Sequence, residues 1–234
     1  MLATNQMNRT PNLEEEFSEQ YDQLVSLIGG DEMRGKAARL NEIYGACEAA
    51  WNRNLYRLRN TDVKYLLIAE AAPWSGGDLT QYFYETFDKD DNGKPIQWIR
   101  SLWKVFYPCP PPNDIEQSLR MLAQSQFLLV DSLPFALSYK SYRKNPEYRE
   151  LVLSCSEYLR MKLQCDRINW SNDCKVALAF KLNGLAVIES FPEGITFPNG
   201  RNIVLGEANI AATGSGFLTN TSLKQVWEID QNFG

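Results

Sequence analysis

The chain has 234 residues, of which 44 % are hydrophobic and 23 % charged, a composition that supplies a substantial core and disfavours disorder. Its formal net charge of −5 disfavours a broad surface for nucleic acid or for an anionic membrane. The sequence contains no histidine, which excludes the usual general base, the usual zinc ligand and any Ser-His or Cys-His nucleophile pair.

The cysteines and the apolar runs indicate the cellular compartment of the protein. The five cysteines are odd in number and lack metal-type spacing, which fits reduced thiols. The first residues are polar, without the apolar centre of a signal peptide. No apolar run approaches the roughly 20 residues that span a bilayer. We therefore expect a cytoplasmic protein with no membrane partner, no metal and no cofactor.

Helix and strand patterns alternate along most of the chain. Residues 1–12 are expected to form a loose tail, and residues 13–234 a single domain. Apolar periodicity predicts a first helix closed by Gly29 and Gly30, followed by helices over residues 36–55, 96–107, 113–124, 146–159, 182–190 and 221–230. Continuous apolar runs predict strands over residues 64–70, 127–131, 174–180 and 201–205. This order predicts an α/β fold, a three-layer α/β/α sandwich with a central, mostly parallel sheet.

Three of the predicted strands are followed by a carboxylate residue and then by a segment that ends the strand. Glu70, Asp131 and Glu207 each follow an apolar run and precede small or proline-containing segments. Open α/β sheets bind ligands at the carboxyl ends of their strands. We therefore expect these three acids to share one crevice.

Each candidate side chain also has a structural alternative. Glu70 could activate water or bind a polar ligand edge, or it could be a loop carboxylate. Asp131 could accept hydrogen bonds from a ligand, or it could be a buried acid satisfied by loop amides. The rings of Tyr82, Phe83 and Tyr84 could stack on a base or a sugar, or they could pack in the core.

Two further segments are candidates for ligand contact. Lys140, Arg143 and Lys144 lie in a basic and aromatic stretch that would suit phosphate contacts, with a solvated loop as the alternative. Residues 206–216 are small, which lets backbone approach a ligand closely, and Asn209 is the amide side chain in that loop.

The order of these pieces resembles the uracil-DNA glycosylase superfamily over about residues 60–230. Residues 69–73, Ala-Glu-Ala-Ala-Pro, resemble the family's motif after its first strand. Asp131 stands where the family has an Asn that reads the base edge, and residues 176–184 resemble its third strand and helix. Residues 207–214 stand where the family has a DNA-penetrating loop of His-Pro-Ser type. The resemblance implies that one ring of residues 82–84 stacks on the flipped base.

The chain departs from that family in two places. The loop histidine, which stabilises charge on the leaving base, is missing, and the base-reading Asn is an acid. An ionised carboxylate accepts hydrogen bonds but donates none to a carbonyl. The leading hypothesis is a divergent DNA glycosylase-like protein that excises or binds a flipped damaged base. One alternative is a non-catalytic binding or inhibitory module on the same fold. Another is a hydrolase of small nucleotides or nucleosides, for which Glu70, Asp131 and Glu207 would be the candidate metal ligands. The partner is then DNA or a nucleotide-like ligand.

Overall fold

The computed structural model describes residues 12–73, 82–84, 97–137, 141–212 and 218–229. The predicted tail, residues 1–12, therefore lies outside the described residues except for Asn12. Asn12 caps the first helix, because its side-chain oxygen accepts a hydrogen bond from the backbone N–H of Glu14.

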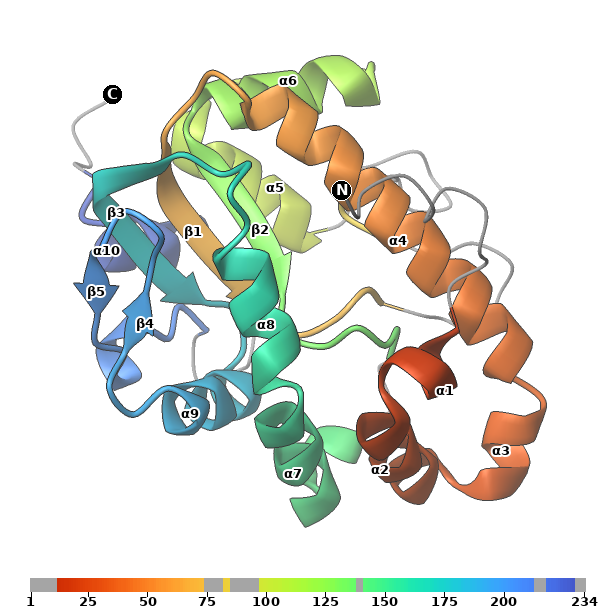
Figure 1. Ribbon diagram of the computed structural model, residues 1–234. Coiled ribbons are helices and arrows are strands. Elements are labelled where there is room, and N and C mark those ends of the chain that lie inside the picture. The colour runs from red at the N-terminus through yellow and green to blue at the C-terminus, as the bar shows by residue number, and fades with distance from the viewer. Residues whose placement is uncertain (1–11, 74–81, 85–96, 138–140, 213–217, 230–234) are drawn as a thin grey trace, which may run out of the picture.

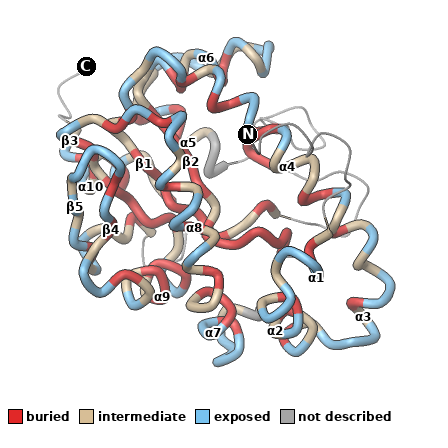
Figure 2. Tube along the Cα trace, in the orientation of Figure 1, coloured by how far each residue is buried: buried red, intermediate tan, exposed pale blue. Residues whose placement is uncertain are grey.

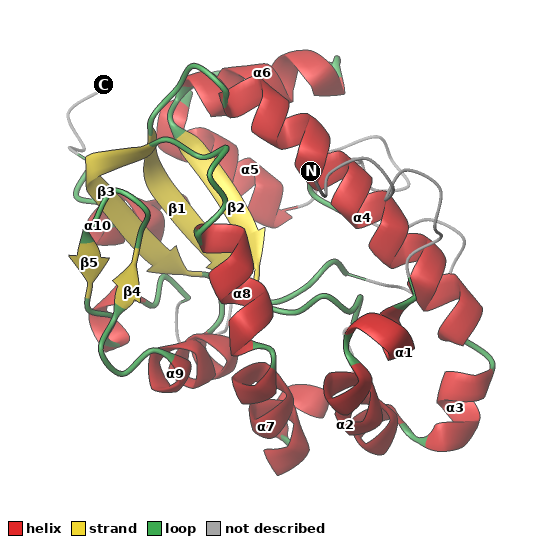
Figure 3. Ribbon diagram, in the orientation of Figure 1, coloured by secondary structure: helices red, strands yellow, loops and turns green. Residues whose placement is uncertain are grey.

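A three-stranded parallel sheet forms the centre of the fold, with strand order β2-β1-β3 (Figures 1 and 3). Its strands are β1 (Val63–Ala69), β2 (Phe127–Asp131) and β3 (Trp170–Leu178). The central residues Leu66, Leu67 and Ile68 are wholly buried, as expected for apolar runs covered on both faces. The predicted α/β class and the parallel sheet are confirmed, and β3 begins four residues earlier than expected.

The described residues contain ten α-helices and two short 3-10 helices, whose order agrees with the predicted alternation. The first predicted helix is split at Phe17, and no helix in the described part of the chain is both long and apolar enough to cross a membrane. The α-helices are α1 (Leu13–Glu16), α2 (Ser18–Ile28), α3 (Gly30–Arg34), α4 (Ala37–Leu58), α5 (Gln97–Phe106), α6 (Ile115–Gln124), α7 (Pro146–Ser154), α8 (Ser156–Leu163), α9 (Lys181–Ser190) and α10 (Asn220–Val226), and the 3-10 helices are η1 (Ser141–Lys144) and η2 (Glu207–Asn209).

Helices lie on both faces of the sheet, with α8 in front of the strands and α5 and α10 behind them in Figure 1, while α9 lies below the strand ends. Behind the sheet, the Trp227 ring lies 5.6 Å from Tyr65 and 5.9 Å from both Phe106 and Phe127. The Trp227 indole N–H also donates to the Leu66 carbonyl oxygen at 3.3 Å. Figure 2 shows the buried residues concentrated along the strands and on the inner sides of the helices, as a layered arrangement requires.

The prediction that residues 201–205 form a strand of the central sheet is wrong. Residues Asn202–Ile203 form β5, which pairs antiparallel with β4 (Ile195–Thr196) in a separate hairpin. Val204 is 70 % exposed, so this run lacks the burial on both faces that a central parallel strand needs. The chain returns to the sheet later, where the Ala211 N–H donates to the Leu178 carbonyl oxygen at 2.9 Å.

The β4–β5 hairpin depends on two glycines with left-handed backbone, which provide a matched test. At Gly194 (φ +89°) an added Cβ would lie 2.6 Å from the Ile203 carbonyl oxygen, whereas at Gly200 (φ +82°) it would meet nothing within 4 Å. Gly200→Ala should lower the free energy of unfolding by about 1–2 kcal/mol through backbone strain. Gly194→Ala should cost roughly 1–3 kcal/mol more through the clash. Urea unfolding measures both, and equal losses would contradict this hairpin geometry.

Candidate functional site

Glu70 lies directly after β1 and is only 5 % exposed, so its carboxylate requires partners inside the protein. The Arg143 guanidinium supplies two of them: Nε donates to Oε1 at 2.7 Å and Nη2 donates to Oε2. The Tyr148 hydroxyl donates to Oε1 as a third partner. The carboxylate therefore accepts two hydrogen bonds from one guanidinium and one from a phenol in a buried setting.

Arg143 and Tyr148 reach Glu70 from two elements that follow β2. Arg143 belongs to η1, and its guanidinium carbon lies 4.8 Å from the centre of the Phe180 ring, over its face. Tyr148 belongs to α7, and burial together with the Glu70 charge raises the pKa of its phenol well above the usual range. Tyr148 therefore stays protonated and acts as a donor to the carboxylate.

Two buried polar residues extend this cluster across the ends of β2 and β3. The Ser132 hydroxyl donates to the Glu70 backbone carbonyl at 3.1 Å, and the Asn183 amide donates to the Ser132 hydroxyl at 2.9 Å. Asn183 is fully buried, and its Oδ1 accepts no hydrogen bond from any described residue. We call Glu70, Ser132, Arg143, Tyr148 and Asn183 the Glu70 network.

Asp131 ends β2 directly beside Ala69 in the register of the two strands. Burial raises the pKa of Asp131 to about 7; the Lys162 ammonium opposes the rise, while Glu70 and Glu48 add to it. No hydrogen bond joins its carboxyl to another residue in the part of the chain that the structure describes. Because the pKa rises on folding, the protonated carboxyl contributes stability at low pH that is lost between 3.8 and about 7.

Lys162 forms its ion pair with Glu48 and not with Asp131. The Lys162 ammonium lies 2.6 Å from both Glu48 oxygens and 4.9 Å from the centre of the Trp51 ring. Its side chain is only 12 % exposed, so the ion pair is poorly screened by water. Lys162 is therefore shared with Glu48, and its charge only partly opposes the rise in the pKa of Asp131.

The three candidate rings lie in the core. Tyr82, Phe83 and Tyr84 are 5 %, 2 % and 3 % exposed. The Phe83 ring packs edge-on against Phe127 at 6.0 Å, and the Tyr84 hydroxyl donates to the Leu129 carbonyl at 2.8 Å while accepting its N–H at 2.7 Å. Stacking of one of these rings on a ligand stays a prediction, since it would require that ring to leave its core contacts.

The remaining candidates are spread over the surface. Glu207 is exposed on η2, and no described side-chain contact joins it to Glu70 or Asp131. Asn209 has a structural role, since its Nδ2 donates to the Val176 carbonyl and its Oδ1 accepts the Gly206 N–H, both at 2.9 Å. Lys144 is exposed on η1, whereas Lys140 lies outside the described residues. Phosphate contact by this basic stretch stays a prediction, with Arg143 engaged by Glu70.

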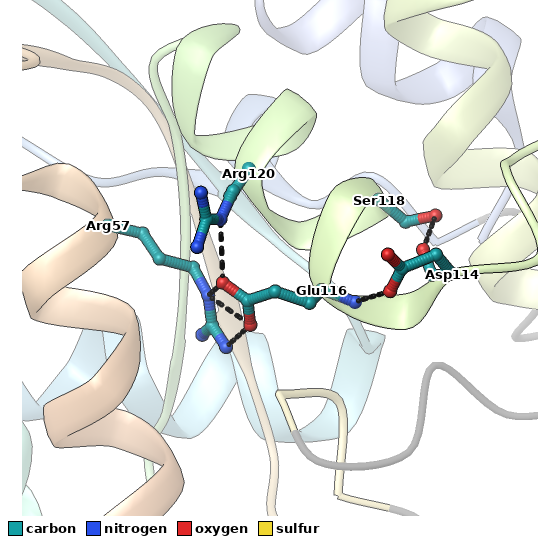
Figure 4. Close-up of polar contacts among 5 residues, drawn as sticks. All are labelled: Arg57, Asp114, Glu116, Ser118 and Arg120. Atoms are coloured by element: carbon teal, nitrogen blue, oxygen red, sulfur yellow. Dashed lines mark hydrogen bonds and ion pairs between the residues drawn. The ribbon is translucent and has the colours of Figure 1, made fainter.

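A second charged network, shown in Figure 4, provides a structural contrast. Glu116 near the start of α6 accepts hydrogen bonds from Arg57 of α4 at 3.2 Å and from Arg120 at 2.9 Å. The hydrogen bonds from Arg57 are the largest cause that lowers the pKa of Glu116 to about 2. Glu116 is 46 % exposed, so this network joins α4 to α6 at the surface.

Three members of the Glu70 network were not predicted as site residues. Tyr148 lay within the helix predicted over residues 146–159, and Asn183 lay within the segment that resembles the third strand and helix of the glycosylase family. Ser132 directly follows Asp131, and this adjacency was the one available signal. In sequence, none of the three differs from an ordinary core or loop residue.

Comparisons with known proteins add no relative. A scan against protein-family models, a search of curated proteins and a search of solved structures found no match to this chain. Among the described residues, no group of three or more Cys, Asp or Glu side chains is placed to hold a metal ion. The resemblance to the glycosylase superfamily therefore stands on the quoted motif residues.

The Glu70–Arg143 contact can be tested against a surface ion pair. Arg143→Met should lower the free energy of unfolding by about 2–4 kcal/mol, because it leaves a buried carboxylate with one phenol as its side-chain partner. Arg149→Met is the matched control, since Arg149 of α7 is half exposed and pairs with Glu189 and Glu150 at the surface. Its loss should barely change stability. Equal effects of the two variants in urea unfolding would contradict the buried role of Arg143.

Proposed function

We propose that this chain is a divergent DNA glycosylase-like protein that binds a flipped, deaminated base at the carboxyl ends of β1 and β2. In this proposal Asp131 reads the edge of the base. The observation that carries it is the surroundings of Asp131: the carboxyl ends a central strand, is bonded to no described side chain, and has a pKa raised to about 7.

A protonated Asp131 carries an O–H hydrogen-bond donor, which the ionised carboxylate lacks. A neutral carboxyl presents one O–H donor and one carbonyl acceptor, the pair that an Asn amide presents as N–H and C=O. Uracil and hypoxanthine carry a carbonyl beside a ring N–H, which is complementary to that pair. The replacement of the family's Asn by an acid is therefore compatible with base reading near neutral pH.

Glu70 is proposed to act on water only after Arg143 leaves it. A general base needs a free lone pair within hydrogen-bond reach of the water, and both Glu70 oxygens accept hydrogen bonds here. Such engagement also supports the alternative of a non-catalytic binding module on the same fold. The net charge of −5 supports the same alternative, or a small nucleotide-like ligand, over extensive contact with DNA.

Base reading by Asp131 predicts a specific dependence of binding on pH. The affinity for a single-stranded oligonucleotide with one uracil should fall about ten-fold for each pH unit above 7, because the O–H donor titrates away. Asp131→Asn should keep the affinity seen at pH 6 and remove its dependence on pH. Fluorescence anisotropy between pH 6 and pH 8.5 measures both.

Asp173→Asn is the matched control, since Asp173 is a surface acid of β3 whose pKa hydrogen bonding to Lys64 lowers to about 2. This variant should bind as the unmodified protein does at every pH. Abasic sites formed from uracil, hypoxanthine, xanthine and alkylated-base oligonucleotides report excision. Binding without any abasic product favours the non-catalytic module, and no binding at any pH overturns the proposal.

A further inference from the structure

The Glu70 network has the features of a ligand-binding site that is occupied by Arg143, a side chain of the same protein. We propose that Glu70 and its neighbours bind a flat group carrying two parallel N–H donors, and that Arg143 occupies this site from within the chain. The proposal goes beyond base reading by Asp131 and beyond the action of Glu70 on water, because it concerns what Glu70 itself binds, and it holds whether or not Asp131 reads a base.

The Arg143 guanidinium shows which shape and which donors the site accepts. Its Nε and Nη2 point at the two oxygens of one carboxylate, which is two-donor recognition of a planar group. The guanidinium also lies over the Phe180 ring, with its central carbon 4.8 Å from the ring centre. A carboxylate at the edge and an aromatic ring at the face together select a flat, donor-rich group.

The walls of the site are fixed without Arg143. Glu70 is 5 % exposed, Ser132 hydrogen-bonds its carbonyl, and Tyr148 donates to its carboxylate. Asn183 adds a fully buried Oδ1 that accepts no hydrogen bond from any described residue. A buried acceptor without a donor costs free energy, so the network holds one unsatisfied polar atom.

Arg143 enters this site from the solvent side. Its side chain is 32 % exposed, whereas that of Glu70 is 6 % exposed. The arginine can therefore swing out while the carboxylate, the phenol and the buried amide stay in place. A second molecule with the same donors would enter along the same path.

Two kinds of ligand present a flat group with two parallel N–H donors. The edge of guanine presents a ring N–H beside an amino group, and an arginine side chain presents the same fork in a guanidinium. Hypoxanthine lacks the amino group and offers one donor alone. Guanosine and inosine therefore form a matched ligand pair that differs in the second donor.

The test uses Arg143→Ala, which empties the site, and follows its melting temperature. Millimolar guanidinium chloride should raise that temperature, with sodium chloride at equal ionic strength as the control. Guanosine and N-acetylarginine amide are then titrated separately, to separate a base from an arginine as the source. At least one of them should bind no less than ten-fold more tightly than inosine, which leaves one carboxylate oxygen without its donor.

The control variant is the double substitution Glu70→Gln/Arg143→Ala, which keeps the cavity and removes one acceptor oxygen. It should not respond to guanidinium, guanosine or N-acetylarginine amide. Asp131→Asn should leave the response of the Arg143→Ala variant unchanged, so failure here is distinguishable from failure of base reading. If none of the three ligands raises the melting temperature of Arg143→Ala, the proposal is overturned.

If Arg143→Ala does not fold, the unmodified protein provides the measurement. The Arg143 Nε–H resonance in ¹H–¹⁵N spectra reports its hydrogen bond to Glu70. Titration with guanosine or N-acetylarginine amide should move this resonance saturably as Arg143 is displaced, and inosine should move it at least ten-fold less effectively. A resonance that stays in place up to the solubility limit of both ligands overturns the proposal.

Discussion

The candidate site depends on one constraint: the side chains of Glu70 and Asp131 are removed from water at the C-terminal ends of β1 and β2. An isolated ionised carboxylate cannot be buried without a large cost, so each acid must gain partners or keep its proton. Glu70 gains partners in Arg143 and Tyr148. Asp131, which is half-buried, gains no such partner among the described residues, and burial raises its pKa to about 7.

The two outcomes follow from which elements surround each acid. Glu70 meets η1 and α7, which supply a guanidinium and a phenol. Asp131 lies near Lys162, but the ammonium of that residue is held by both oxygens of Glu48. One end of the sheet therefore carries an ion pair with a buried carboxylate next to an acid whose pKa is raised. An acid with a raised pKa beside a buried ion pair is a recurring feature of functional sites, which makes this edge the best candidate in the described chain.

The sequence was informative where a local pattern decides the structure. The apolar runs of β1 and β2 predicted buried parallel strands, and their last polar residues predicted Glu70 and Asp131 at one edge of the sheet. The segment 201–205 was misassigned because a short apolar run fits a hairpin as well as a central strand. The exposure of Val204 and the antiparallel pairing with β4 separate the two. The rings of residues 82–84 were ambiguous, because an aromatic cluster suits a core and a stacking site equally.

The partners of Glu70 could not be derived from the sequence. Arg143 and Tyr148 lie 73 and 78 residues further along the chain, and Asn183 reaches the network through Ser132 over 51 residues. Such pairings arise when η1, α7 and α9 pack together at the strand ends, and no residue periodicity encodes them. The raised pKa of Asp131 depends equally on the tertiary structure, since it results from burial and from the commitment of Lys162 to Glu48.

The most direct test of this account is the titration of the Asp131 side chain, followed through its ¹³Cγ chemical shift and assigned by its absence in Asp131→Asn. The account predicts a midpoint near pH 7, because burial disfavours the ionised carboxyl and Glu48 retains the lysine charge. A midpoint near the ordinary value of 3.8 would show that Asp131 is ionised throughout the neutral range. That result would contradict the proton-holding acid on which base reading depends.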